Sequence, residues 1–176
     1  MSDLFKNLAE VFSKGTNDWG SLHPLVVHFP IALLFVAPLF ITLGLIVQKL
    51  LKVFYICALI LMLLGTVGVF FAISTGNSAA AILPADPAIT ATLDTHVRFA
   101  EQSRLNFSIT SGAFFLYVVF LPKLIQKCRN RLNLAVVCIF LIIYAFNLLF
   151  LFNTAHYGGR LVHEHGIKST LYVNPK

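Results

Sequence analysis

The residues in this sequence best suited to chemistry are its six histidines. Two buried imidazoles on different helices are what an axially ligated haem requires, whereas copper or zinc takes three or four converging ligands. The spacing of the histidines along the chain does not distinguish a haem site from a copper or zinc site. Which imidazole rings come together depends on how the helices that carry them are placed. The six are His23, His28, His96, His156, His163 and His165.

Composition places these histidines in a membrane protein. Of the 176 residues, 58% are hydrophobic and only 11% are charged, which is too apolar for a soluble domain. The net charge of +6 comes mostly from basic residues at the ends of apolar runs, so it indicates topology and not nucleic-acid binding. The sequence shows no nucleophile motif and no phosphate-binding glycine loop. We therefore expect an electron-transfer or binding subunit more than a stand-alone enzyme.

Four apolar runs are long enough to cross a bilayer, which takes about 20 mainly apolar residues. Short turns at 48–52 and 122–131 join the first run to the second and the third to the fourth. Two helical hairpins of this kind pair into an all-α, integral membrane four-helix bundle. The predicted spans are residues 25–47, 53–73, 105–121 and 134–152.

The two short turns also predict the direction of the spans. They hold six Lys or Arg residues and no acid, and short basic loops stay in the cytoplasm. Both termini and all the histidines then lie at the outer face of a bacterial inner (plasma) membrane. Residues 1–18 are predicted to form an amphipathic helix that lies on the membrane surface or packs on a partner subunit. Residues 19–176 form the bundle with a periplasmic C-terminal tail.

Depth in the membrane groups three of the histidines. Counted back from the basic turns, His23, His96 and His156 lie 26, 27 and 25 residues away, within about one helical turn of the same level. The same count puts His28 about a turn and a half deeper. Together with Glu164, the three level histidines would offer the ligands that copper or zinc needs.

Burial favours a different pair. His28 shares a helical stripe with Ala32, Phe35 and Leu39, and it should turn inward because a lipid-facing imidazole there would be costly. His96 should turn inward as well, since its charged neighbours lie on the opposite side of the helix. Helix tilt and a bend at a proline can erase a turn of depth mismatch. His28 and His96 are therefore the predicted axial pair of a b-type haem. The inward face of His96 carries Ala100, Ser103, Phe107, Thr110 and Phe114.

Other residues complete a haem site at the same end of the bundle. A row of small residues in the second span, Gly68, Ala72 and Gly76, admits a flat ring or another helix. The pair Gly158 and Gly159 permits a tight reversal that brings the His-Glu-His run at 163–165 back over the mouth of the bundle. The cations available for the haem propionates are Arg98, Arg104 and Arg160.

Two motifs in the chain resemble those of a known family. The run LHPLVVHFPIAL at 22–33, and Gly-Gly-Arg-Leu-Val at 158–162 followed by His-Gly at 165–166, are similar to the bacterial predicted membrane protein family called domain of unknown function 2231. The resemblance implies matching roles for His23, His28, His96 and His165, while the family usually has Tyr in place of His163. Relatives are fused to cytochrome c or Rieske-type domains, and the four-helix design is similar to that of membrane haem b cytochromes.

The leading hypothesis is a membrane-integral b-type haem protein that transfers electrons near the outer membrane face. Its expected partners are the lipid bilayer, a cytochrome c or Rieske-type redox protein, and further copies of itself. One alternative is a membrane module that binds copper or zinc through three or more histidines. The other is a structural subunit or anchor of a membrane redox complex, whose histidines line an interface.

Cysteine labelling tests the direction of the spans. In a background without the native cysteines, a cysteine introduced near Ala85 should react with an impermeant reagent added from outside, because the segment between the second and third spans is periplasmic in this topology. A cysteine near Asn130 should not react. Labelling near Asn130 from outside would invert the topology and place the histidines at the cytoplasmic face.

Overall fold

The part of the chain that the structure describes is almost entirely helical. The computed structural model describes residues 2–127 and 130–169, and no strand occurs within these ranges. The all-α prediction is confirmed. The elements are α1 (Ser2–Asn17), η1 (Trp19–Leu22), α2 (His23–Val26), α3 (His28–Ile46), η2 (Gln48–Leu50), α4 (Leu51–Ala80), α5 (Pro87–Lys127) and α6 (Asn130–His163).

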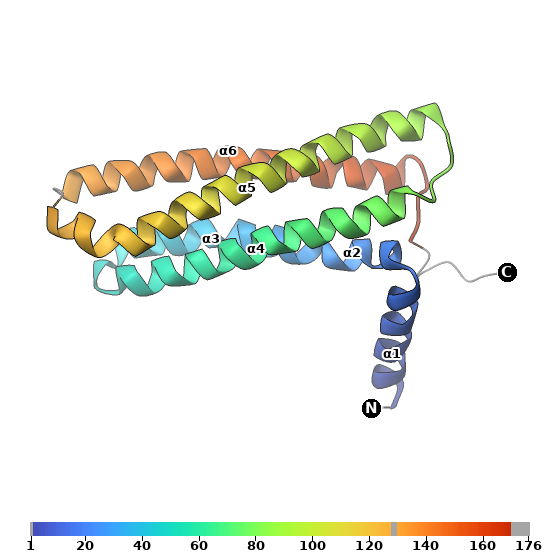
Figure 1. Ribbon diagram of the computed structural model, residues 1–176, viewed down its shortest axis with the longest axis horizontal. Coiled ribbons are helices and arrows are strands. Elements are labelled where there is room, and N and C mark those ends of the chain that lie inside the picture. The colour runs from blue at the N-terminus through green and yellow to red at the C-terminus, as the bar shows by residue number, and fades with distance from the viewer. Residues whose placement is uncertain (1, 128–129, 170–176) are drawn as a thin grey trace.

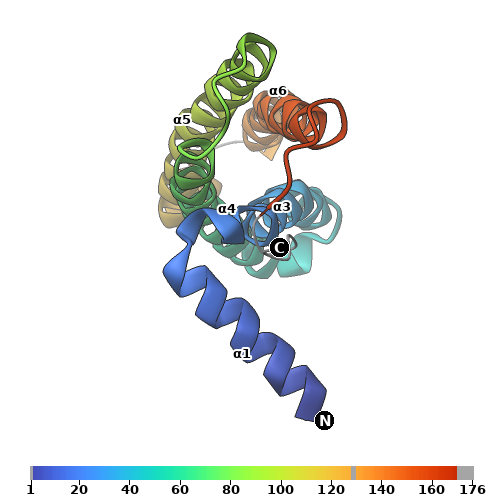
Figure 2. The same ribbon diagram turned by 90° about the vertical axis from the view of Figure 1, so that its right-hand side faces the viewer.

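The long helices form two hairpins that lie side by side (Figure 1). α3 packs along α4 and α5 packs along α6, while α4 contacts α5 and α3 contacts α6. α2 continues into α3 with a break at Val27. At one end of the bundle α2 and α5 begin and α4 and α6 end; we call this the histidine end, and Figure 2 views the molecule from it.

Three helical stretches in the described part of the chain are long and apolar enough to cross a membrane. They are Trp19–Ile46, Gln48–Ala80 and Leu132–His163. Large apolar side chains on their outer sides are exposed, among them Phe35 at 50% and Ile142 at 70%, as contact with lipid requires. The remaining predicted span, 105–121, lies within α5, and its crossing of the membrane stays a prediction.

The helices run beyond the apolar spans expected from the sequence. A helix rises 1.5 Å per residue, so the 30 residues of α4 extend about 45 Å, more than the hydrocarbon core of about 30 Å. α5 begins early because the carboxylate of Asp86 accepts a hydrogen bond from the N–H of Ala88 at 2.7 Å and caps the first turn. The extensions at the histidine end carry most of the histidines.

The paired glycines do not form the predicted reversal. Gly158 and Gly159 both lie inside α6, which continues to His163. The chain turns instead at Gly166, whose φ of +68° suits glycine. The prediction is wrong because packing against α5 outweighs the roughly 1 kcal/mol by which each glycine disfavours a helix. Beyond the turn, the Ser169 hydroxyl donates to the carbonyl of Ser21 at 2.8 Å, which ties the end of α6 to η1.

A hydrogen bond to the backbone of α3 links the two hairpins. Pro38 lies inside α3 and has no N–H, so the Leu34 carbonyl lacks its normal helical partner. Tyr144 on α6 donates its hydroxyl to that carbonyl at 2.8 Å, and the side chains of Leu34 and Tyr144 are fully buried. Because lipid offers no replacement for this bond, it holds α6 against α3.

Two further buried hydrogen bonds set the rotation of α5. Ser111 Oγ lies 2.8 Å from Thr66 Oγ1 of α4, and Thr110 Oγ1 accepts a bond of 2.7 Å from Asn147 Nδ2 of α6. This orientation turns His96 toward the interior, because a residue two heptads before Thr110 lies on nearly the same face. The predicted inward face of His96 is confirmed by the buried side chains of Ser103, Phe107, Thr110 and Phe114.

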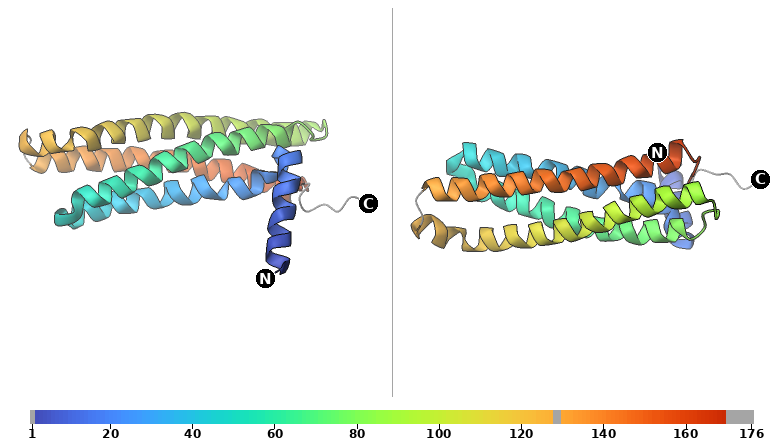
Figure 3. Two further views of the ribbon diagram at one scale, coloured as in Figure 1. Left: turned by 60° about the horizontal axis from the view of Figure 1, so that its bottom comes forward. Right: turned by 90° about the horizontal axis from the view of Figure 1, so that it is seen from above.

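α1 leaves the histidine end across the axis of the bundle (Figure 3). Its helical state is shown, and its contact with a membrane surface stays a prediction. Gly20 permits the following turn to pack closely, because a Cβ there would lie 2.6 Å from the backbone nitrogen of Ala79. Trp19 Nε1 donates to Ser74 Oγ at 3.1 Å, so α4 is bonded to the segment between α1 and α2.

Tyr144→Phe tests the link to α3. The substitution leaves the Leu34 carbonyl unpaired, so the free energy of unfolding measured in micelles should fall by about 1–3 kcal/mol. In a Pro38→Ala background the backbone N–H at position 38 can pair with that carbonyl. Tyr144→Phe should then lower the free energy of unfolding by clearly less. An equal loss in both backgrounds would contradict the proposed pairing.

Candidate cofactor site

The two hairpins enclose a cavity of about 530 Å³ at the histidine end. Its walls come from both hairpins and are mostly apolar or small side chains. Sites for small molecules and cofactors typically measure about 300–1,000 Å³. Four of the six histidines line the cavity, namely His23, His28, His96 and His163.

His23 and His96 face each other across this cavity from opposite hairpins. His23 begins α2 and His96 lies in α5. Their ring centres are 6.4 Å apart and the ring planes are perpendicular. The structure thus pairs His96 with His23. The sequence had favoured His28 as the partner, because its imidazole was expected to turn into the bundle.

Hydrogen bonds orient both rings in the same way. His96 Nδ1 lies 2.8 Å from the Thr154 carbonyl, which can only accept, so Nδ1 carries the proton and Nε2 keeps its lone pair. His23 Nδ1 lies 3.1 Å from Thr75 Oγ1, whose hydroxyl already donates to backbone carbonyls one turn before it. Thr75 therefore accepts from His23. Each imidazole keeps Nε2 free to bind a metal, and Nδ1–H bonds of this kind are typical of metal-ligating histidines.

A glycine lies beside the Cε1 edge of each ring. A Cβ at Gly76 would lie 3.0 Å from Cε1 of His23, and one at Gly158 would lie 3.1 Å from Cε1 of His96. The row of small residues on α4 also admits Pro30, which a Cβ at Gly68 would approach to 3.2 Å. Gly76 and Gly158 thus leave space for the two imidazole rings.

His28 borders the cavity but does not turn into the core as expected. Its ring is exposed, and Phe35 and Leu39 on its stripe are 50% and 56% exposed. The buried stripe of α3 runs instead through Pro30, Leu34, Ala37, Ile41 and Gly44. The prediction of an inward stripe is wrong because α3 is rotated so that the stripe containing Leu34 and Ile41, and not the one containing Phe35 and Leu39, turns into the bundle.

The remaining histidines have separate surroundings. His156 is exposed, lies outside the cavity and has its ring centre 5.4 Å from that of Tyr157. His163 is exposed at the end of α6 and contributes to the cavity wall. His165 Nε2 lies 3.0 Å from Thr92 Oγ1, which ties the segment after α6 to the start of α5.

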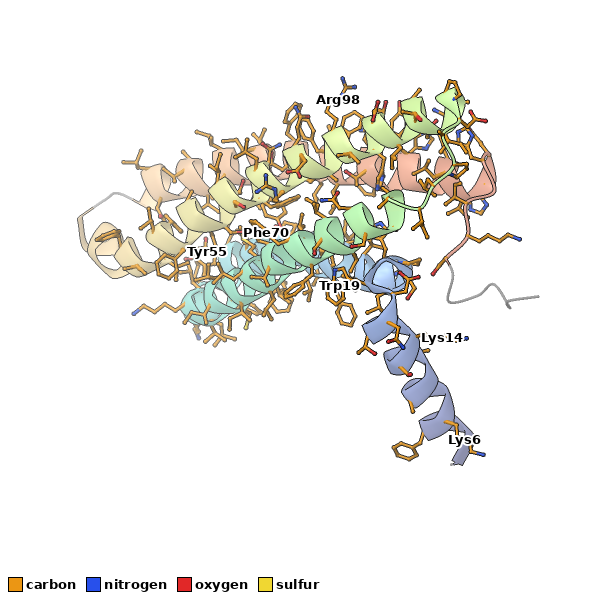
Figure 4. The ribbon with its side chains drawn as sticks, turned by 45° about the vertical axis from the view of Figure 1, so that its right-hand side comes forward. Lys6, Lys14, Trp19, Tyr55, Phe70 and Arg98 are labelled. Carbon is orange, nitrogen blue, oxygen red and sulfur yellow. The ribbon has the colours of Figure 1, made fainter. Side chains whose placement is uncertain are left out.

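None of the three arginines expected around a haem lines the cavity. Arg98 lies over the ring of Phe99 and points away from the bundle (Figure 4). Arg104 bonds Glu101 at 2.6 Å, and Arg160 bonds Glu164 at 2.8 Å. The Arg160 guanidinium also holds the pKa of the Glu164 carboxyl below its usual value. These guanidinium groups stay at the surface because carboxylates and aromatic rings there already engage them.

A copper or zinc centre with three or four protein ligands is not assembled here. Within residues 2–127 and 130–169, no three side chains of His, Cys, Asp or Glu come close enough together to hold a metal ion. His23 and His96 meet, but His156 and Glu164 lie outside their cavity. Of the four histidines that line the cavity, His23 and His96 form the one pair of rings in contact, and one pair of imidazoles suits an axially ligated group better than a bare ion with a full protein shell.

Sequence reasoning missed three contributors to this site. Thr75 and the backbone of Thr154 orient the rings, and Glu101 lines the cavity although its place beside Arg98 predicted the opposite face. The role of the two threonines could not be predicted from the sequence, because each contacts a histidine on another helix. Only the packing of the hairpins reveals them.

Comparison with known proteins agrees with a membrane protein. Residues 20–171 match the family described as Predicted membrane protein (DUF2231). The chain belongs to this family. No curated protein and no solved structure matches it. The DUF2231 match covers α2 to α6 and therefore every residue of the cavity.

Two neighbouring glycines of α6 provide a matched test of the space behind His96. Gly159→Ala meets no atom within 4 Å and should stabilise the helix by about 0.5–1 kcal/mol. Gly158→Ala should be less stable than Gly159→Ala by about 1–3 kcal/mol, because His96 is held by its hydrogen bond and cannot move aside. Unfolding in micelles measures both. Equal stabilisation by the two substitutions would show that His96 does not pack against Gly158.

Proposed function

We propose that the cavity binds haem b with His23 and His96 as the axial ligands, and that the protein transfers electrons near the outer membrane face. The pair of rings carries this proposal. Two metal–nitrogen bonds of about 2.0–2.1 Å and the half-widths of two imidazole rings add to roughly 6 Å. The ring centres lie 6.4 Å apart, and each Nδ1 lies at a hydrogen-bond acceptor, which leaves Nε2 of the neutral imidazole available as a ligand.

The shape of the cavity supports a flat ligand. The hairpins contribute one ligand each, so a ring held between them would lie between the two halves of the bundle. Small residues face this space from both sides, including Ala72 and Gly76 on α4 and Ala100 and Gly158 on α5 and α6. Side chains without bulk are what the close approach of a tetrapyrrole plane requires.

The protein's own groups would tune and protect such a site. Bound haem supplies one-electron exchange at its iron. Thr75 and the Thr154 carbonyl fix the direction of each imidazole and raise its basicity as a ligand. The apolar inner wall, which includes the buried Val69 and Leu151, keeps water from the site and so influences the potential.

The proposed location follows from the basic turns. Four spans with both termini outside would place the cavity at the periplasmic side of a bacterial inner membrane. There it would exchange electrons with a soluble or tethered redox partner, of the cytochrome c or Rieske type that the family resemblance implies. A cavity at the end of the bundle, and not at its centre, suits exchange with a partner outside the membrane.

The two alternatives fit the cavity less well. A copper or zinc module would need a third protein ligand, which the described residues do not bring to His23 and His96. A structural anchor would have no use for 530 Å³ of space, because cavities without a ligand lower stability. Haem binding uses both the ring pair and the space.

Spectra of purified protein test the proposal. Protein produced with haem supplementation and without chelators should show a Soret band that shifts on reduction with dithionite. His96→Ala should abolish binding, and His23→Ala should abolish it or leave five-coordinate, high-spin haem, since each removes one axial nitrogen.

His28→Ala and His156→Ala are the matched controls, and both should keep the wild-type spectrum. If His28→Ala empties the site while His23→Ala does not, the ligand pair is His28 and His96. Colourless protein that contains copper or zinc by elemental analysis would overturn the haem proposal. Protein empty of haem and metal would favour the structural role.

A further inference from the structure

The wall of the cavity changes character along the bundle axis. Val69 and Leu151, near its inner end, are 5% and 8% exposed and apolar. Asn77 lies eight residues after Val69 on α4, and His163 twelve residues after Leu151 on α6, so they stand about 12 and 18 Å nearer the histidine end. Both Asn77 and His163 are exposed and line the cavity. The cavity thus has an apolar floor and a polar rim.

The rim draws one residue from each hairpin. Asn77 lies near the end of α4, and His163 is the last residue of α6. The side chains of both residues can donate hydrogen bonds to a carboxylate, the amide through Nδ2 and the imidazole through an N–H. No hydrogen bond to the side chain of either residue is found within the described part of the chain.

The floor and one side wall exclude a carboxylate. An unpaired charge among Val69, Leu151 and their apolar neighbours would be strongly unfavourable. Glu101, the acid in the wall, lies five residues along α5 from His96 and therefore about 7 Å deeper than that ring. Its carboxylate is already paired with Arg104 and can only accept hydrogen bonds, so it offers no donor to a ligand carboxylate at that depth.

We infer that the cavity orients a planar dicarboxylate ligand, with its carboxylate edge at the rim formed by Asn77 and His163 and its apolar edge on the floor. This inference rests on the proposed function, because haem b carries its two propionates on one edge. It assigns the propionates to Asn77 and His163 in place of the three arginines that the sequence offered. It also gives His163 a role that neither its exposure nor the family resemblance predicted.

Binding of haemin and of haemin dimethyl ester tests the orientation. The full chain, freed of haem and placed in lipid nanodiscs, is titrated with each compound, and binding is followed at the Soret band. The wild-type protein should bind the diacid about tenfold more tightly than the diester, as the loss of a charge-assisted hydrogen bond predicts. Asn77→Ala with His163→Ala should bind the two compounds equally.

Asn153→Ala with His156→Ala is the matched control, since it removes the same two residue types from exposed positions of α6 outside the cavity. It should keep the tenfold preference. Asn77→Asp is the conservative variant if the alanine pair fails to fold. It keeps the shape of the side chain, and it should weaken the diacid while leaving the diester unchanged.

The outcomes separate this inference from the haem proposal. Equal binding of both compounds by the wild-type protein would overturn the orientation and leave haem binding intact. A preference that survives in the alanine pair, or in Asn77→Asp, would show that Asn77 and His163 are not the partners. Binding of neither compound would overturn both the orientation and the proposed function.

Discussion

Key polar groups inside this bundle find their partners across helices, because the surrounding lipid offers none. The bond from Tyr144 to the Leu34 carbonyl shows how much depends on this constraint. Pro38 removes the partner that the helix itself would provide, and the neighbouring hairpin supplies another. Such bonds fix how the two hairpins lie against each other. Every feature of the cavity follows from that arrangement, since its walls belong to both hairpins.

The same constraint acts on the two histidines. A partly buried imidazole needs a partner for its N–H, and His23 and His96 each find one on an adjacent helix. Their Nδ1 atoms are thereby engaged, and the glycines beside the two rings leave space for them. Ordinary hydrogen bonding and packing therefore orient the two imidazoles as a pair of ligands, without an unusual residue or a strained backbone.

The sequence predicted what depends on periodicity and composition. It predicted the helical class, the hairpins and the inward face of His96, because apolar and small residues recur at helical spacing along α5. It could not predict the rotation of α3, because nearly all of its residues are apolar and no face stands out. That is why the stripe of His28 was expected to turn inward.

Contacts between helices also escaped prediction. Nothing along the chain connects Thr75 with His23 or the Thr154 carbonyl with His96, and the arginines looked free until their surface partners were known. The glycines at 158 and 159 resembled a turn because glycine serves equally in turns and in close helix contacts. The family match to DUF2231 supports a membrane protein. The chemistry proposed for the cavity is argued from the geometry of its residues.

Low-temperature electron paramagnetic resonance of the oxidised, haem-loaded protein tests the central claim most directly. The planes of His23 and His96 are perpendicular, and perpendicular axial imidazoles leave two iron d orbitals nearly equal in energy. The account predicts a low-spin ferric signal with a single large, highly anisotropic g feature that is lost in His23→Ala and in His96→Ala. A rhombic low-spin signal typical of parallel imidazoles, or a signal unaffected by His23→Ala, would contradict it.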